Sequence, residues 1–256
     1  MHYSINNTKL NVLELGNGPL TLVFLHYFGG SALEWQLVMS QLDDQHRCVA
    51  IDLRGHGDSE SPASGYSVST MANDVLALLR LLDVRHFSLI GHSMGGKVAL
   101  ALASEQPAGL QSLILLSPSP PVPEPISDTD RATMLETHGQ QEAAEQTVAK
   151  ITARPLSKEV KNQIIADNLR TSNEAWKAWL TLGSREDISG KMRTINQPVA
   201  ILVGTADQAI KPEVQSEMTL PYLKTATIDT IDKAGHLLPW ETPDDVVAFI
   251  RRHASA

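Results

Sequence analysis

The sequence contains one cysteine, Cys48, among its 256 residues. A single thiol excludes an intramolecular disulfide, and it excludes the cysteine clusters that bind structural zinc or iron–sulfur groups. A chain of this length can bury roughly 70–75% of the surface of its unfolded form, so it needs no such cross-link. We therefore expect a globular protein that is held together by its own hydrophobic core.

Positive charge is scarce as well, with 21 Lys and Arg against 29 Asp and Glu and a formal net charge of −8. This balance argues against a nucleic-acid-binding protein and against a polybasic membrane module. The first residues, Met1–Asn7, lack the basic start and the apolar stretch of a signal peptide. No apolar run approaches the ~20 residues of a membrane span. We expect a cytoplasmic protein without a nucleic-acid or membrane partner.

Short apolar segments rich in β-branched residues alternate along the chain with helical patterns, such as the one over 68–82. Strands are predicted over 20–26, 48–52, 87–91, 113–116 and 199–204. This alternation indicates a mainly parallel sheet covered by helices on both faces. At the start of the chain, segments 3–7 and 10–15 predict a polar hairpin at the sheet edge.

A proline-rich stretch from Pro118 to Pro125 interrupts this alternation, and a purely helical pattern follows from 127 to about 188. A helical insertion between two strands predicts a cap over the carboxyl edge of the sheet, where ligands bind in open α/β folds. We expect a core formed by 1–117 and 191–256 and a helical cap over 118–190. Charged cap residues such as Arg131 are expected on solvated helix faces.

The segment Gly91-His92-Ser93-Met94-Gly95-Gly96 directly follows a predicted strand and opens a helical pattern. A Gly-x-Ser-x-Gly sequence between a strand and a helix is typical of a nucleophile elbow, in which a strained turn exposes the serine hydroxyl. The alternative is a glycine-rich turn with a capping serine, and the flanking strand and helix favour the elbow. Ser93 is the predicted nucleophile, and the Met94 amide is a predicted oxyanion donor.

A serine hydroxyl needs a base near neutral pH, and the base needs a carboxylate that orients it. In folds with this elbow the partners follow in the order Ser, Asp or Glu, His. The sequence supplies Asp207 after the predicted strand 199–204 and His236 before the last helix. A rival acid position after the strand 113–116 holds Ser117-Pro118-Ser119 and no carboxylate. Asp207 and His236 are therefore the predicted acid and base.

These motifs resemble the α/β-hydrolase superfamily, and more narrowly its small bacterial cap-bearing serine esterases, relatives of haloperoxidase-type enzymes, enol-lactonases and biotin-pathway esterases. The turn 52–59 matches the superfamily pattern Asp-x-x-Gly-x-Gly-x-Ser, and Gly235-His236 with Glu241 and Pro243 matches its catalytic-histidine segment. The resemblance implies an α/β-hydrolase fold: a mostly parallel eight-stranded sheet flanked by helices, with a helical cap inserted after the sixth strand. It also implies that neither a cofactor nor a metal is required.

The loop His26-Tyr27-Phe28-Gly29-Gly30 resembles the superfamily's His-Gly-x-x-Gly turn, which implies that the Phe28 amide is the second oxyanion donor. Tyr27 stands where the family has glycine, which raises the question of how the backbone turns there. A turn without a catalytic role is the alternative.

Several large apolar residues close to these motifs are candidates for a substrate pocket. Trp176 and Trp179 are three residues apart and so share one face of a cap helix, where they either line the pocket or simply pack the cap onto the core. The other candidates are Tyr27, Trp35 and Leu237.

Together these features predict a serine hydrolase that cleaves carboxylic esters through an acyl-enzyme, with a small-molecule ester or lactone as its substrate. Lactone hydrolysis and C–C bond hydrolysis by the same triad are alternatives within enzymes. A slow-turnover ligand sensor is the alternative from another class, because a fold alone does not define a function. The sequence leaves the natural substrate and the oligomeric state open.

Overall fold

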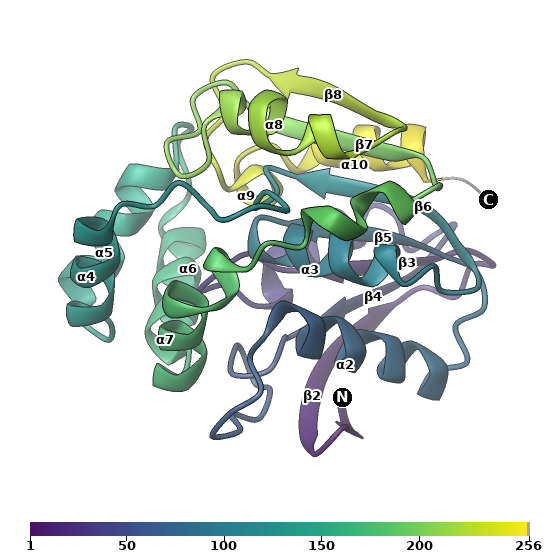
Figure 1. The fold of residues 1–256 in the computed structure, drawn as a ribbon, viewed down its shortest axis with the longest axis horizontal. Coiled ribbons are helices and arrows are strands. Elements are labelled where there is room, and N and C mark those ends of the chain that lie inside the picture. The colour runs from purple at the N-terminus through teal and green to yellow at the C-terminus, as the bar shows by residue number, and fades with distance from the viewer. Residues whose placement is uncertain (255–256) are drawn as a thin grey trace.

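The computed structural model of the protein describes residues 1–254, which form an eight-stranded sheet in the order β1-β2-β4-β3-β5-β6-β7-β8 (Figure 1). The strands β1 and β2 and the pair β2 and β4 are antiparallel, and all other pairs are parallel. The strands are β1 His2–Ile5, β2 Thr8–Leu15, β3 Thr21–Leu25, β4 Arg47–Ile51, β5 Phe87–His92, β6 Leu110–Leu116, β7 Val199–Gly204 and β8 Ala226–Ile231. This sheet confirms the predicted α/β-hydrolase fold class.

The central strands are mainly apolar and are buried along their whole length, as expected for a sheet that is covered on both faces. In the parallel register Leu25 lies between Ile51 of β4 and Gly91 of β5. The carboxyl ends of β3, β4 and β5 therefore lie side by side at one edge of the sheet. The segments with the predicted functional motifs begin at this edge.

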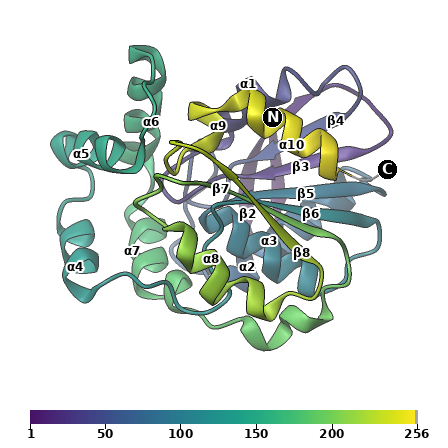
Figure 2. The same ribbon diagram turned by 90° about the horizontal axis from the view of Figure 1, so that it is seen from above.

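Helices cover both faces of the sheet (Figure 2). The helices α2 and α3 pack on one face, and α1, α9 and α10 pack on the other. The bounds are α1 Gln36–Met39, α2 Val68–Leu81, α3 Met94–Ser104, α4 Asp128–Glu136, α5 Gln141–Ile151, α6 Lys158–Arg170, α7 Asn173–Thr181, α8 Pro212–Met218, α9 Leu238–Glu241 and α10 Pro243–His253. Short 3₁₀ helices are η1 Ala32–Trp35, η2 Gly183–Arg185, η3 Ser189–Thr194 and η4 Leu220–Tyr222.

The four helices α4 to α7 follow β6 and precede β7, so the predicted helical insertion after the sixth strand is present. In both ribbon views they lie together beside the sheet rather than on its faces. The division into a core over 1–117 and 191–256 and a cap over 118–190 stays a prediction. None of the helices in the described part of the chain is long and apolar enough to span a bilayer.

Arg131 of α4 corrects one expectation, because it is only 5% exposed rather than solvated. Its guanidinium donates hydrogen bonds of 2.6 Å to the carbonyl of Leu180 and to the hydroxyl of Ser184. These partners satisfy the buried charge and attach α4 to the end of α7 and to η2. A helical pattern alone cannot distinguish such a residue from a solvated one, since its acceptors lie about fifty positions further along.

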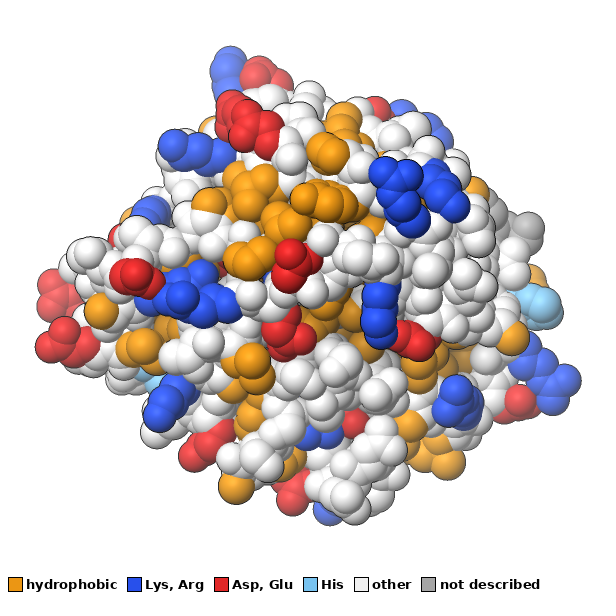
Figure 3. All heavy atoms as spheres, in the orientation of Figure 1, with side chains coloured by type: hydrophobic (Ala, Val, Ile, Leu, Met, Phe, Trp, Pro, Cys, Tyr) orange, Lys and Arg blue, Asp and Glu red, His pale blue; other side chains and the backbone are white. Residues whose placement is uncertain are grey.

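The surface of the face shown in Figure 3 mixes acidic and basic side chains, and apolar side chains gather between them near the centre of the view. The charges on this face are therefore interspersed rather than separated by sign.

Candidate active site

The turn between β5 and α3 holds Ser93 in a strained backbone conformation, with φ 51° and ψ −116°. L-residues rarely adopt this region, and they persist there when the surroundings demand it. A Cβ added at Gly91 would lie 2.5 Å from the carbonyl oxygen of Gly95, and one added at Gly95 would lie 2.5 Å from that of Leu25. The two glycines are therefore required by close backbone approach, as the elbow pattern predicts.

Asp207 and His236 form a buried pair in which Oδ2 of the carboxylate lies 2.7 Å from Nδ1 of the ring. Asp207 follows β7, and His236 follows β8. Oδ1 of Asp207 also accepts hydrogen bonds from the amides of Ala209 and Ile210. Burial by itself would raise the pKa of Asp207, but His236 and the hydrogen bonds to the carboxylate hold that pKa below its usual value. An ionised Asp207 requires Nδ1 of His236 to carry a proton, which leaves Nε2 as an acceptor.

The chain segment of Ser93 contacts that of His236 through His92. Nε2 of His92 lies 2.9 Å from the carbonyl oxygen of His236, and the two imidazole rings have their centres 5.0 Å apart. The hydroxyl of Ser93 makes no hydrogen bond to another residue in 1–254, and the residue is 7% exposed. The structure thus brings together the segments of all three predicted triad residues and joins two of them directly.

Glu241 organises the loop that carries His236. Its carboxylate accepts hydrogen bonds from four backbone amides, those of Ala153 at 2.9 Å, Arg154 at 2.8 Å, Gly235 at 3.0 Å and Leu237 at 3.1 Å. The first two amides follow α5 of the insertion, and the last two flank His236. The carboxylate therefore connects the insertion to the histidine loop. The sequence identifies Glu241 only as part of the catalytic-histidine motif. Its role as an acceptor that connects the insertion to the histidine loop does not follow from the sequence.

The predicted oxyanion donors belong to two loops at the same sheet edge. Neither the Met94 amide nor the Phe28 amide donates a hydrogen bond to another of the described residues. The loop of Phe28 closes through a hydrogen bond of 3.0 Å from the Gly30 amide to the Tyr27 carbonyl. The tyrosine ring fits at position 27 because residue 30 is a glycine. A Cβ atom added at Gly30 would lie 2.5 Å from the Tyr27 ring.

The side chain of Phe28 faces the insertion. Its ring centre lies 4.4 Å from that of Trp176 and 6.1 Å from that of Trp179. Both tryptophans are buried, and the indole nitrogen of Trp176 donates to the carbonyl of Met134 at 2.8 Å. The contacts show that the tryptophans pack the insertion onto the Phe28 loop. A role for them as pocket walls stays a prediction.

The remaining pocket candidates lie in the interior. Trp35 and Leu237 have no exposed surface, and Tyr27 is 5% exposed. Trp35 packs against Phe24 beneath the sheet, with ring centres 5.0 Å apart. Tyr27 and Leu237 share an apolar cluster with side chains of α5 and α6, namely Val148 and Ile164. These three residues are therefore placed as packing residues around the site in this structure.

Asp52 organises the turn that follows β4. Its carboxylate accepts hydrogen bonds from the Ala32 amide at 2.6 Å, from the Asn11 side chain at 2.9 Å and from the Asp58 amide at 2.8 Å. Gly57 is needed because a Cβ there would lie 2.2 Å from this carboxylate. In residues 1–254 no group of three or more His, Cys, Asp or Glu side chains is arranged to hold a metal ion.

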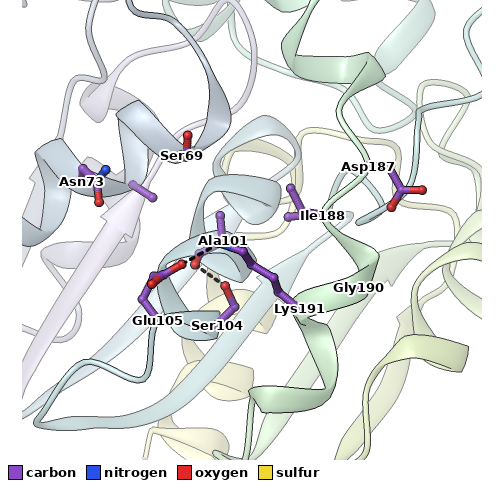
Figure 4. A pocket seen from close by; sticks show the side chains of 10 residues that line it. Ser69, Asn73, Ala101, Ser104, Glu105, Asp187, Ile188, Gly190 and Lys191 are labelled. Atoms are coloured by element: carbon purple, nitrogen blue, oxygen red, sulfur yellow. Dashed lines mark hydrogen bonds and ion pairs between the residues drawn. The ribbon is translucent and has the colours of Figure 1, made fainter.

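A cavity of about 360 Å³ lies away from these residues, between α2, α3 and η3 (Figure 4). Its lining includes Ser69, Asn73, Ser104, Glu105 and Lys191, and none of the predicted triad residues. Lys191 pairs with Glu105 at its exposed rim. Ser104 is buried, and its hydroxyl donates to the carbonyl of Ala101 at 2.7 Å. This cavity is therefore separate from the predicted site.

Comparison with known families agrees with this geometry, because the model of the "Alpha/beta hydrolase family" matches residues 22–249. The chain belongs to this family. The match extends from β3 to β8, includes the insertion and reaches α10, so it includes every predicted site residue.

Individual relatives are more distant. A "Dihydrolipoyllysine-residue acetyltransferase component of acetoin cleaving system" from Cupriavidus necator is 29% identical over 97% of this chain and 67% of its own length. An esterase from Exiguobacterium antarcticum has a TM-score of 0.91 at 20% identity, covering 98% of this chain and 97% of its own. The enol-lactonase from Burkholderia xenovorans has a TM-score of 0.86 at 22% identity, covering 98% of each chain. Four other curated relatives are matched over only 30% to 41% of their own length, so the match spans less than half of each. Three more are matched over 87% to 96% of theirs.

Proposed function

We propose that this member of the family is a serine hydrolase that cleaves carboxylic esters, with Ser93, His236 and Asp207 as its catalytic triad. The observation that carries the proposal is the buried hydrogen bond of 2.7 Å between Asp207 and His236, at the sheet edge where Ser93 occupies a strained elbow. A carboxylate in this place selects the imidazole tautomer whose Nε2 accepts a proton.

In the first half of the reaction, Nε2 of His236 takes the proton of the Ser93 hydroxyl while the oxygen attacks the ester carbonyl carbon. The amides of Met94 and Phe28, which have no acceptor within residues 1–254, stabilise the oxyanion of the tetrahedral intermediate. His236 then gives its proton to the leaving alkoxide, which departs as an alcohol and leaves an acyl group on Ser93.

In the second half, His236 removes a proton from a water molecule that attacks the acyl carbonyl. Collapse of the second tetrahedral intermediate returns the proton to Ser93 and releases the carboxylic acid. Asp207 stays ionised throughout and stabilises the imidazolium that forms in each half. The chain's own residues therefore account for every proton transfer.

A lactone is a cyclic ester and passes through the same acyl-enzyme, and this fold is shared with an enol-lactonase. Lactones are therefore the second substrate class that we propose. The helical insertion over 118–190 acts as a cap in this account, because its tryptophans pack on the Phe28 loop and its backbone is attached to Glu241.

The test is turnover of an aryl ester series of increasing acyl length, together with lactones, by the parental protein and by Ser93→Ala. We expect continued turnover by the parental protein and a loss on the order of 10⁶ in kcat for Ser93→Ala, as in other triads. A burst of one product equivalent followed by no turnover would indicate a ligand sensor instead. Equal activity of the two proteins would reject Ser93 as the nucleophile.

A further inference from the structure

A second carboxyl group lies in the interior directly behind the proposed triad. Glu34 of η1 is 1% exposed, and its Oε2 lies 3.3 Å from Nδ1 of His92, which has no exposed surface. The other ring nitrogen of His92 lies 2.9 Å from the carbonyl oxygen of His236. Glu34, His92 and the main chain of His236 therefore form a continuous buried series. The proposed mechanism uses neither Glu34 nor the ring of His92.

The partners of His92 determine where its protons are. A carbonyl oxygen can only accept, so the contact with the His236 carbonyl requires a proton on Nε2 of His92. If the ring is neutral, Nδ1 is then a lone-pair acceptor, and Glu34 must donate to it as a carboxylic acid. The alternative is an ion pair between an imidazolium and a carboxylate.

The surroundings of Glu34 favour the neutral arrangement. The second carboxyl oxygen of Glu34, Oε1, is buried without any hydrogen-bond partner, so an anion there would lack solvation. Burial, and after it the charge of Asp167 on α6, raises the pKa of Glu34 well above its ordinary value, although a contact with the Tyr27 backbone opposes this. Burial, and after it repulsion from His236, lowers the pKa of His92 well below its ordinary value.

The groups that face this pair from the other packed elements do not reverse this balance. Tyr27 lies against His92 with ring centres 5.4 Å apart, and burial raises the pKa of its phenol well above the ordinary value, so it stays neutral. His26, at the end of β3, has a pKa lowered to about 4 by burial and is neutral too. The carboxylate of Asp167 accepts hydrogen bonds from Ser31, Gln163 and Arg170. These donors, Arg170 included, therefore contact Asp167 and not Glu34. No cation among these groups stabilises an ionised Glu34.

We propose that Glu34 is a positioning residue that remains protonated in the working enzyme, donates to Nδ1 of His92 and thereby makes His92 hold the main chain of His236. The proposal rests on the proposed function, because the segment that is held is that of the catalytic base. Asp207 contacts the ring of His236 as an anion. Glu34, in contrast, acts on the main chain of His236 as a neutral acid, through the ring of His92.

A neutral His92 also matters for the charge that develops in the reaction. The ring centres of His92 and His236 are 5.0 Å apart, and His236 becomes an imidazolium in each half-reaction. A second imidazolium at His92 would oppose that charge in a buried site, where like charges interact strongly. Glu34 as an acid leaves His92 uncharged at this moment.

The first test measures the protonation of Glu34 without any substrate. Infrared spectra of the parental protein at pH 7, compared with those of Glu34→Gln, should contain the carbonyl stretching band of a protonated carboxylic acid that the variant lacks. The band should persist in Ser93→Ala, which leaves Glu34 in place. Its absence from the parental protein would overturn the proposal.

The second test compares two substitutions at the same position. Glu34→Gln keeps a donor to Nδ1 of His92 and should retain most of the parental kcat, whereas Glu34→Leu removes the donor and should lower kcat on the order of 10²-fold, because His236 loses its alignment. KM should change little in either variant, and thermal unfolding should confirm that both are folded. Equal losses in both variants, or none in Glu34→Leu, would overturn the positioning role. Because the infrared measurement needs no turnover, failure of this proposal is distinguishable from failure of the proposed function.

Discussion

Two carboxyl–imidazole pairs meet at the His236 segment, and their surroundings give them opposite charge states. Asp207 accepts hydrogen bonds from two backbone amides and from the imidazole of His236, and its pKa is lowered despite burial. In residues 1–254 the Glu34 carboxyl has a hydrogen bond of 3.3 Å to His92, its other oxygen is buried without a hydrogen-bond partner, and burial raises its pKa. The comparison teaches that burial alone does not decide whether a carboxyl group is charged. Neighbouring charges and the hydrogen bonds that the carboxyl oxygens accept act together with burial.

The largest contrast is expected when each acid is replaced by its neutral amide. Asp207→Asn should lower kcat by about 10⁴, because the amide favours the wrong imidazole tautomer of His236. Glu34→Gln should leave most of the activity, because the parental residue already acts as a neutral donor. Steady-state kinetics of the two variants side by side measure the contrast. Near-parental turnover by Asp207→Asn would mean that another carboxylate supports the base.

Phe28 extends the comparison to a residue whose main chain and side chain have different roles. Phe28→Pro removes the amide that we assign to the oxyanion, so kcat should fall by roughly 10²–10³ with a smaller change in KM. Phe28→Ala keeps the amide and removes only the ring that packs on Trp176, so its kcat should stay within about tenfold of the parental value.

Because proline also constrains Tyr27 before it, the two variants must be measured together. Equal losses would assign the effect to the ring and leave the second oxyanion donor unidentified.

Glu241 is a third acid, and its carboxylate has more donors than either of the first two. In the parental protein the two carboxylate oxygens of Glu241 accept hydrogen bonds from four amides, and Glu241→Gln keeps only one of these oxygens. The free energy of unfolding should therefore fall by about 2 kcal/mol. The activity should fall as well, since the histidine loop loses its attachment to the insertion. Denaturant unfolding and kcat report the two effects. An unchanged stability would show that the four hydrogen bonds contribute little.

The smallest expected effect is on the pH dependence of stability. Glu34 is protonated in the folded protein, whereas in the unfolded chain it ionises near its ordinary pKa of 4.5. Between about pH 5 and 7 folding therefore takes up a proton at Glu34, and this contribution makes the protein less stable as pH rises. Glu34→Gln should make the slope of the unfolding free energy against pH more positive by up to about 1.4 kcal/mol per pH unit. A parallel slope in the two proteins would contradict a protonated Glu34.

Most of the sheet could be predicted from the sequence, because each of the strands β3 to β7 contains a short apolar run in a chain of alternating strands and helices. The strand β8 was not located, since most of its residues are exposed or only half-buried and give no such run. The helix α3 begins at Met94, directly after the serine of the elbow, where the Gly-x-Ser-x-Gly motif predicts a helix start.

Among the site residues, Asp207 and His236 could be selected from the sequence because Asp207 follows the predicted strand 199–204 and His236 precedes the last helix, in the order that the resemblance implies. The pair of Glu34 and His92 was not, because 58 positions separate these residues and no local pattern links them. The link that Glu241 makes to the insertion was equally hidden, since the amides of Ala153 and Arg154 lie 88 and 87 positions away.

The central claim is that Ser93 is the nucleophile of a serine hydrolase. The most direct measurement is peptide mapping by mass spectrometry after reaction with a fluorophosphonate, which phosphonylates activated serine hydroxyls and releases fluoride. We expect one adduct per chain, on the peptide that contains Ser93. Ser93→Ala should not be labelled, and Asp207→Asn should be labelled slowly. An enzyme that hydrolyses esters while its adduct lies on another residue, or while Ser93 remains unmodified, would contradict it.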